Sequence, residues 1–244
     1  MRVLTFTIRN SKEMIREPLN LALGIGFPLV VLVLLSVIQA NIPEDLFVIE
    51  RLIPGIAVFG LSFIATFSGT LIAADRDTSF LLRLFTTPLT AYDYIMGYTL
   101  PLLPMAILQI IISFIAAFFL GLTLNLNVLL SILILIPAAV VFIGFGLLAG
   151  SLFNEKMVGN VCGAVLTNLT VWLSGAWFDL DLVGGWFEKL AYSLPFAHAV
   201  DASRAAIVGD YSAIMPHLWW VIGYAVVTML IAIVVFKKKM TSDQ

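Results

Sequence analysis

Six apolar stretches that contain no acidic or basic charge constrain this chain more than any other feature. An α-helix rises about 1.5 Å per residue, so about 20 residues cross the roughly 30 Å hydrocarbon layer of a membrane. The chain is 61% hydrophobic and 11% charged, whereas soluble domains are about 25% charged. We therefore expect an all-α integral membrane protein, one transmembrane domain over residues 1–244, with spans at Leu19–Ala40, Leu52–Ala74, Gly97–Leu120, Val128–Leu152, Met157–Phe178 and Pro216–Phe236.

The residue types in the chain argue against ion-driven transport, ATP binding and a metal site. Membrane proteins driven by protons or ions usually keep ionisable groups inside the bundle, but here only His217 lies at the edge of a span. No P-loop motif is present, so we expect no ATP site in this chain. One cysteine, Cys162, and two histidines give no cluster for a metal site, and nothing predicts nucleic-acid binding.

The distribution of Lys and Arg predicts the orientation. Ten of these residues fall in the N-terminal arm, the second and fourth loops and the C-terminal tail. Arg51, Lys189 and Arg204 fall on the other side. We therefore expect both termini in the cytoplasm. The compact loops, without a transit or lipidation signal, favour the plasma membrane of a bacterium or archaeon.

The N-terminal arm, residues 1–17, is predicted to form an amphipathic helix. At 100° per residue, Arg2, Arg9, Lys12 and Arg16 share an arc of about 80°. Such a helix lies along the membrane surface with its basic face toward anionic lipid or a cytosolic protein. The alternative is that these charges only set the topology.

The second loop is predicted to hold a short cytoplasmic helix at Thr78–Thr86, directly after Asp75, Arg76 and Asp77. Thr90 and Asp93 fit a capping box that starts the next helix. We expect this short helix to dock a cytosolic motor, the alternative being a helix that only floats on lipid. Its apolar residues share one face while Arg83 points elsewhere; they are Phe80, Leu81, Leu84 and Phe85.

The fifth loop, Asp179–Met215, is divided by Pro195 into two helical pieces at about Val183–Ser193 and Ala197–Val208. Apolar pieces of this length are too short to span a membrane and are typical of re-entrant segments. Four residues of this loop are candidates for an outer gate, the alternative being a structural ion pair: Pro195, His198, Asp201 and Arg204.

Small, polar and aromatic side chains recur at helical spacing in the second and fifth spans. Such stripes either pack helices closely or line a transport route, and an amide in hydrocarbon needs a partner. The candidates for a route are Phe63, Thr66, Phe67, Thr70, Asn160, Thr167, Asn168, Val171 and Trp172.

The order of these features resembles the membrane subunit, or permease, of ABC-2 type transporters. The resemblance covers nearly the whole chain. Four stretches carry it. The first is Arg9–Pro18 followed by Phe27-Pro28, and the second is Leu52–Gly55 at the start of the second span. The third is Asp75–Asp77 followed by Leu84–Thr90 and Tyr94–Gly97, and the fourth is Leu194–Phe196 with Arg204 and Gly209.

The resemblance implies an exporter in which two six-helix subunits, identical or related, each dock a cytosolic ATPase subunit. That partner would hold ATP and Mg²⁺, while this chain carries no cofactor. The arm helix and the short helix at Thr78–Thr86 would transmit its motion, with Asp75, Arg76, Asp77, Thr78, Arg9, Lys12 and Arg16 at the contact. The path would lie at the dimer interface, and the cargo would be apolar or amphipathic, such as a drug, antibiotic, lipid or glycolipid.

Three other functions stay open at this point. A secondary carrier or channel would need polar groups near the bilayer midplane. A membrane enzyme would need a catalytic group, and the candidates are His198 with Asp201, or Glu188. A scaffold or immunity protein would share the same hydrophobic pattern without transport.

Overall fold

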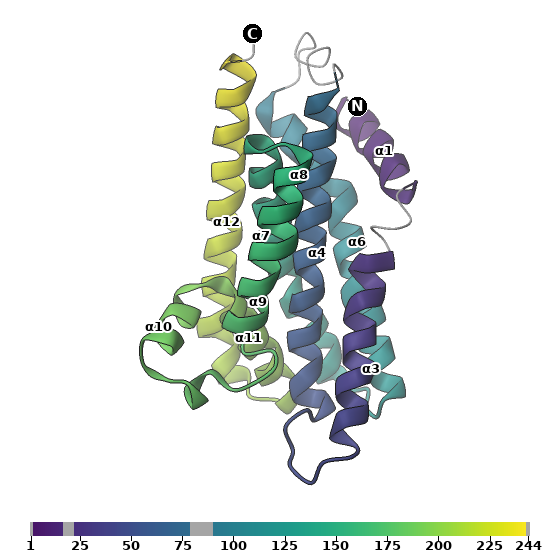
Figure 1. Cartoon of the computed structure of the whole chain (residues 1–244), viewed down its shortest axis with the longest axis vertical. Helices are drawn as coiled ribbons and strands as arrows, with labels where there is room; N and C mark the ends of the chain where they lie inside the picture. The colour runs from purple at the N-terminus through teal and green to yellow at the C-terminus, as the bar shows by residue number, and fades with distance from the viewer. Residues whose placement is uncertain (1, 17–21, 79–89, 243–244) are drawn as a thin grey trace.

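The computed structural model describes residues 2–16, 22–78 and 90–242. Every regular element in these ranges is a helix, so the predicted all-α class is confirmed for them (Figure 1). The elements are α1 (Arg2–Ile15), η1 (Ala22–Gly26), α3 (Phe27–Gln39), α4 (Ile49–Asp77), α6 (Ala91–Phe119), α7 (Leu126–Leu152), α8 (Glu155–Val158), η2 (Gly159–Leu166), α9 (Thr167–Leu173), η3 (Leu180–Leu182), α10 (Gly185–Ser193), α11 (Pro195–Val208) and α12 (Tyr211–Ser242).

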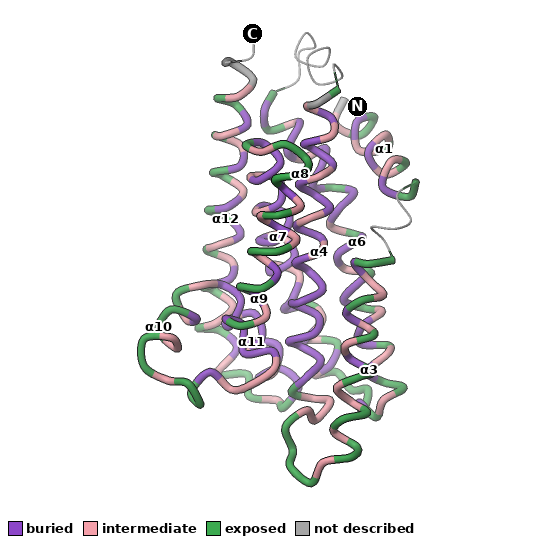
Figure 2. Tube along the Cα trace, viewed as in Figure 1, coloured by how far each residue is buried: buried purple, intermediate pink, exposed green. Residues whose placement is uncertain are grey.

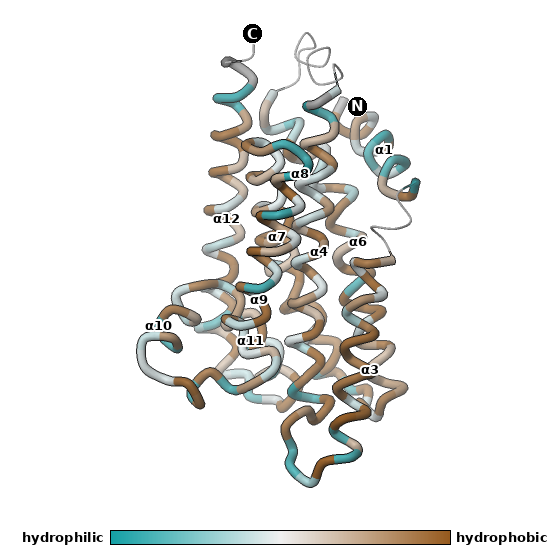
Figure 3. The backbone as a smooth tube through the Cα atoms, viewed as in Figure 1, coloured by the Kyte–Doolittle hydropathy of each residue, from teal (hydrophilic) through white to brown (hydrophobic). Residues whose placement is uncertain are grey.

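The long helices run side by side and give the bundle two distinct ends. The α1 end holds α1, α8, the C-terminal turns of α4 and the C-terminal turns of α12 (Figure 1). The α11 end holds α10, α11 and the connection from α3 to α4. Brown, hydrophobic backbone dominates the length between these ends (Figure 3).

Five helical segments in the described ranges are long and apolar enough to cross a membrane. They are Ala22–Gln39, Ile49–Arg76, Ala91–Phe119, Leu126–Leu152 and Tyr211–Lys239. The structure differs from a regular helix in the region of the predicted fifth span, Met157–Phe178. There α8, the π-helix η2 and α9 follow one another and end at Leu173. A π-helix widens the turn and often marks a functional position.

Helix α4 lies at the centre of the bundle (Figure 2). In its most apolar window 78% of the residues are buried, against 22% in α12 and in Ala22–Gln39. Its contact with α7 is close because both helices carry glycine there: a Cβ placed on Gly150 would lie 2.3 Å from the carbonyl oxygen of Gly69. Small residues are what allow membrane helices to approach at this distance.

Local signals read from the sequence appear at the helix ends. The hydroxyl of Thr90 accepts from the backbone of Asp93, and the Asp93 carboxylate accepts from the backbone of Thr90, so the predicted capping box is present. Pro195 starts α11, and Gly209 ends it with φ of 81°, in the left-handed region that favours glycine. The fifth loop therefore contains the two predicted helices, α10 and α11, divided at Pro195, together with the short η3 and the first residues of α12.

Candidate functional site

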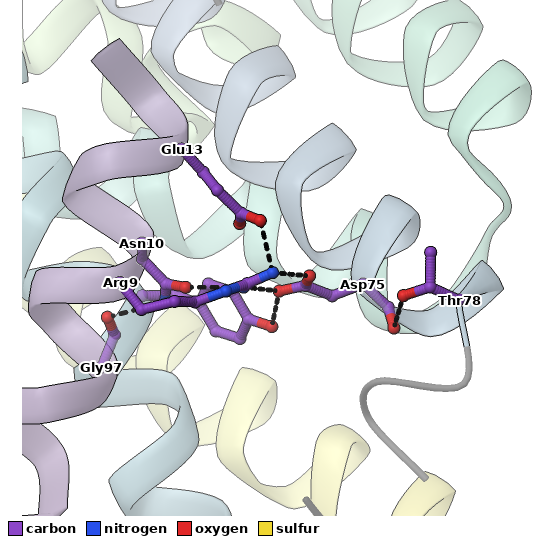
Figure 4. Close-up of polar contacts among 7 residues, drawn as sticks. Arg9, Asn10, Glu13, Asp75, Thr78 and Gly97 are labelled. Atoms are coloured by element: carbon purple, nitrogen blue, oxygen red, sulfur yellow. Dashed lines mark hydrogen bonds and ion pairs between the residues drawn. The ribbon is translucent and has the colours of Figure 1, made fainter. Parts of the chain in front are cut away.

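The side chain of Arg9 joins α1 to the last turns of α4 (Figure 4). Its Nη1 lies 2.6 Å from Oδ2 of Asp75 and its Nη2 lies 2.7 Å from Oδ1, which is the bidentate arrangement. Nη2 also donates to Glu13 at 2.5 Å. The hydroxyl of Tyr98, on α6, donates to Oδ2 of Asp75 at 2.7 Å. One carboxylate therefore connects three helices.

Burial makes this ion pair a structural element. The Asp75 side chain is 6% exposed and the Arg9 side chain 30%. Burial lowers the pKa of Arg9, but the hydrogen bond and the charge of Asp75 outweigh it, so the pKa is raised overall. Arg9 thus faces the bundle instead of the lipid or cytosolic partner expected from the helical pattern, whereas Lys12 and Arg16 are exposed.

A second contact holds α1 flat against α6. Asn10 is fully buried, and its side-chain amide donates to the carbonyl oxygen of Gly97 at 3.1 Å. Phe6 lies edge-on to Tyr94 and Tyr98, with ring centroids 5.7 and 5.0 Å apart. A Cβ on Gly97 would lie 2.3 Å from Cδ1 of Phe6, so the glycine is what admits this ring.

Arg76, next to the ion pair, fastens the same turn of α4 to α7. Its Nη1 donates to the carbonyl oxygens of Gly150 at 2.8 Å and Phe153 at 3.3 Å, where α7 ends. A cation at the C-terminus of a helix satisfies carbonyl groups that have no partner in the helix. Asp75 and Arg76 therefore fix the end of α4 to three neighbouring helices.

The predicted short helix at Thr78–Thr86 lies mostly outside the described residues. Thr78 is exposed, and its hydroxyl donates to the carbonyl oxygen of Asp75 at 3.1 Å. Asp77 is the last residue of α4. The other predicted docking residues fall in the range that is not described: Phe80, Leu81, Arg83, Leu84 and Phe85.

A cavity of about 370 Å³ lies beside the Arg9–Asp75 pair. It is amphipathic, because an apolar wall from α4 meets charged groups from α1, the end of α4 and the start of α8. Its lining residues are Arg9, Glu13, Arg16, Phe67, Thr70, Leu71, Ala74, Asp75, Thr78 and Glu155.

The candidate path residues of α4 form a half-exposed stripe. Phe63, Thr66 and Thr70 are partly exposed, while Phe67 is only 4% exposed. The hydroxyls of Thr66 and Thr70 donate to carbonyl oxygens of their own helix, at 3.2 and 3.0 Å. These hydroxyls still have lone pairs that can accept from a passing molecule.

The candidate path residues of η2 and α9 divide between a buried and an exposed face. Thr167 is buried and donates to the carbonyl oxygen of Cys162, and Val171 is half-buried. The exposed face carries Asn160, Asn168 and Trp172. The amide of Asn168 donates to the carbonyl oxygen of Ala164 at 2.8 Å, so its expected partner is its own helix.

At the α11 end, Arg204 ties α11 to two other segments. Its Nε donates to the carbonyl oxygen of Arg51 at 2.9 Å and its Nη2 to that of Gly175 at 2.8 Å. The predicted local pair with Asp201 is present but longer, at 3.8 Å. Burial lowers the pKa of Arg204, and the charges of Asp201 and Asp179 oppose that effect.

A second cavity, of about 290 Å³, lies against this arginine. Its lining combines aromatic and apolar side chains with Arg51 and Asp179, which form an ion pair of 3.3 Å. It is lined by Asp45, Leu46, Phe47, Arg51, Leu52, Ala176, Trp177, Phe178, Asp179, Leu182 and Arg204.

The remaining gate candidate, His198, contacts α12 instead of Asp201. Its Nδ1 lies 2.7 Å from Nδ1 of His217, and its Nε2 lies 2.9 Å from the carbonyl oxygen of Tyr192. Asp201 accepts from the hydroxyl of Tyr192 at 2.8 Å. Burial lowers the pKa of His198, and the neighbouring His217 lowers it further.

Sequence reasoning missed three participants in these networks: Asn10, Tyr98 and Tyr192. Each is a single polar residue whose partner lies on a different helix. Their partners lie 87, 23 and 9 residues away along the chain. A signal was available only for Asn10, a polar residue that at 100° per residue lies between Phe6 and Met14, outside the basic arc of α1.

The sequence profile of the ABC-2 type transporter family matches residues 1–208. The chain belongs to this family. That stretch of the ABC-2 type domain includes α1, the Arg9–Asp75 pair, both candidate path helices and α11. No curated protein matches the chain.

Proposed function

We propose that this ABC-2 type chain is the membrane subunit of an ATP-driven exporter for an apolar or amphipathic molecule. A separate cytosolic subunit would bind ATP and Mg²⁺ and hydrolyse the ATP. A second membrane subunit, identical or related, would complete the path. The α1 end would face the cytoplasm of a bacterium or archaeon, at its plasma membrane, with surrounding lipid covering the exposed apolar helices.

The observation that supports this proposal best is the three-helix connection at Asp75. Segment 79–89, which follows α4 and precedes α6, is bracketed by two helices that Asp75 and Tyr98 hold together. Arg9 adds α1 to the same point. A force applied to α1 or to that segment would therefore reach α4 and α6 together. Such a connection would let movement of an ATP-hydrolysing partner reach the membrane helices, as the proposal requires.

The proposed topology has six spans, with α8, η2 and α9 forming one of them. These three elements follow one another without a break from Glu155 to Leu173. Six crossings put both termini on one side, which agrees with α1 and the end of α12 lying at the same end of the bundle. The basic residues Lys12, Arg16 and Lys156 also lie at that end, as the rule for cytoplasmic loops requires.

The proposed route runs between the two cavities, along the half-exposed stripe of α4. The cavity at the α1 end offers apolar and charged walls together, which suits an amphipathic cargo. Between the ends, Phe27, Phe59 and Phe63 meet edge to face or tilted, with centroids 5.4–5.9 Å apart. Aromatic walls bind varied apolar surfaces without specific polar contacts.

The deciding experiment is purification of the tagged chain from its native cells in mild detergent, with mass spectrometry of the proteins retained. The proposal expects a stoichiometric P-loop ATPase and nucleotide hydrolysis in the complex. A chain that purifies alone as a stable oligomer would overturn it in favour of a carrier, channel or scaffold.

A second experiment addresses coupling. Because Asp75 has a structural role, its replacement confuses folding with coupling, and segment 79–89 is the better target. Leu81→Pro should break the predicted short helix, so that ATP hydrolysis continues while transport stops. Arg83→Gln is the milder companion variant. Normal transport in the Leu81→Pro variant would contradict the assignment of this segment as the docking element.

A further inference from the structure

His198 and His217 place two imidazole rings in direct contact where α11 packs on the first turns of α12. The two Nδ1 atoms are 2.7 Å apart and the ring centroids 5.0 Å apart. The chain has only these two histidines. His198 is also flanked by Trp220, with ring centroids 5.2 Å apart. The pair therefore joins two helices through two side chains that can each take up a proton.

The surroundings fix the position of each proton. The carbonyl oxygen of Tyr192 can only accept, so Nε2 of His198 must carry a hydrogen to use that 2.9 Å contact. In neutral His198 the Nδ1 atom then carries no hydrogen and can only accept a hydrogen bond through its lone pair. His217 must therefore donate its Nδ1–H across the 2.7 Å gap. This arrangement uses both rings in their neutral form and one tautomer of each.

Successive protons have opposite effects on this contact. A first proton on Nε2 of His217 leaves its Nδ1–H in place and gives the donor a positive charge, which strengthens the bond. A second proton must go to Nδ1 of His198. Two N–H groups and two positive charges then face each other across the gap, and the contact cannot persist.

The neighbouring charges do not cancel that second charge. Asp201 favours the protonated form of His198, but burial opposes it more strongly, and the carboxylate already accepts from the hydroxyl of Tyr192. Helices α7 and α9, which pack on α11, carry no charged residue. On α11 and the elements packed against it, the other titratable or charged groups toward this end are Arg204 on α11 itself, Glu188 and Lys189 on α10, Glu50 and Arg51 on α4, and Tyr211 and Tyr224 on α12. The remaining charged residues of α4 and α12, Asp75–Asp77 and Lys237–Lys239, lie at the other end of those helices.

We propose that His198 and His217 form a proton-operated clasp between α11 and α12, closed with no proton or one proton bound and opened by the second. Acidification would then release α11, whose Arg204 holds the cavity at the α11 end. Which side of the membrane supplies the protons depends on the orientation given under the proposed function. The clasp itself does not depend on that function. It would make the α11 end respond to acid through His198 on α11 and His217 near the start of α12.

The first test is the titration of the full chain in lipid nanodiscs, labelled with ¹⁵N-histidine. Two histidines give two imidazole spin systems, whose ¹⁵N shifts report the tautomer and charge of each ring. The clasp predicts Nε2–H for neutral His198 and two protonation steps more than about one pH unit apart. Two independent titrations near the ordinary histidine pKa would overturn it.

The second test measures opening directly, by backbone amide exchange of residues 195–208 at pH 7.5 and 4.5 after correction for the intrinsic rate. Protection should fall about tenfold or more in the unchanged chain. His217→Gln is the matched control, because its amide donates to neutral His198 and its carbonyl accepts from protonated His198. This variant should keep its protection at both pH values. If both proteins lose protection equally, or neither does, the clasp is wrong.

His198→Gln is the reciprocal variant, in case His217→Gln folds poorly. It keeps an acceptor toward His217 and removes the second proton, so its protection should not change with pH either. Neither measurement uses transport or an ATPase partner. A chain that proves not to be an exporter can therefore still pass or fail this test.

Discussion

Arg9 and Asp75 are 66 residues apart in the chain, yet both Nη atoms of the arginine lie within 2.7 Å of the two carboxylate oxygens. This pair decides where α1 sits. It places the amphipathic arm against the last turns of α4 and the first turns of α6, where segment 79–89 begins and ends. The arm is therefore part of the bundle's structure and not only a topology signal.

Replacing Asp75 by Asn should destabilise the protein by about 2–3 kcal/mol. Loss of one partner from a buried ion pair costs about 3–5 kcal/mol of stability. The expected cost is lower here because the Arg9 side chain is 30% exposed and solvent weakens its interaction with Asp75. The measurement is thermal or denaturant unfolding in detergent. Lys12→Gln, on the exposed face of the same helix, is the control and should change stability by less than about 0.5 kcal/mol. Equal effects of the two variants would show that the pair has no structural role.

Gly97→Ala should displace α1. The added Cβ would lie 2.3 Å from Cδ1 of Phe6, so either the ring or the whole arm must move. Overpacking of this kind costs about 1–3 kcal/mol. Gly223→Ala is the control, because nothing lies within 4 Å of its added Cβ and alanine favours a helix. Faster proteolysis within residues 2–16 in Gly97→Ala alone would confirm the displacement.

The sequence was most informative where the signal is local. Pro195, Gly209 and the Thr90–Asp93 capping box each act on their own turn, so the ends of α6 and α11 could be predicted from a few residues. Hydrophobicity alone predicted where the five long apolar helices lie in the sequence, but α4, α6 and α12 begin before the predicted spans. In the region of the predicted span Met157–Phe178 the structure has α8, η2 and α9, which end at Leu173, and composition reveals neither the π-helix nor the turn after Leu173.

Contacts between helices were not readable in the same way. The basic arc of α1 was clear, but an arc does not show which of its members turns toward the bundle. Arg9 does so because Asp75 and Asn10 lie beside it in space, and neither position follows from local periodicity. His198 was grouped with Asp201 and Arg204 by spacing, yet its partner is His217, 19 residues away on another helix.

Arg204→Met should loosen the α11 end. The variant keeps most of the side-chain volume but removes the donors that satisfy the carbonyl oxygens of Arg51 and Gly175. Hydrogen bonds to a charged group contribute about 1.5–3 kcal/mol, so we expect a loss of about 2–3 kcal/mol. Lys189→Met, at an exposed position of α10, is the control and should behave as the unchanged protein in the same unfolding measurement.

Stability should fall on acidification because of His198. Burial lowers its pKa in the folded protein, so the unfolded chain binds the proton more readily. The stabilisation by neutral His198 is therefore complete above the ordinary histidine pKa and is lost as pH falls below it. Each kcal/mol lost lowers the unfolding midpoint by about 2–4 °C. The fall from pH 7.5 to 5.5 should be smaller in His198→Gln, and an identical fall would assign it to other groups.

The exposed amides of Asn160 and Asn168 predict a protein neighbour on that face. One amide hydrogen of Asn168 is used within its own helix, on the carbonyl oxygen of Ala164. Both side chains are nevertheless exposed on the described chain, and exposed polar atoms are costly in the hydrocarbon layer unless protein or water surrounds them. Under the proposed function a second membrane subunit covers them. In native membranes, Asn168→Cys should therefore form a disulfide between two copies under mild oxidation, while Leu108→Cys, on an exposed apolar face of α6, should not. Cross-linking to a different protein would indicate a related partner subunit, and equal cross-linking at both positions would mean random collision.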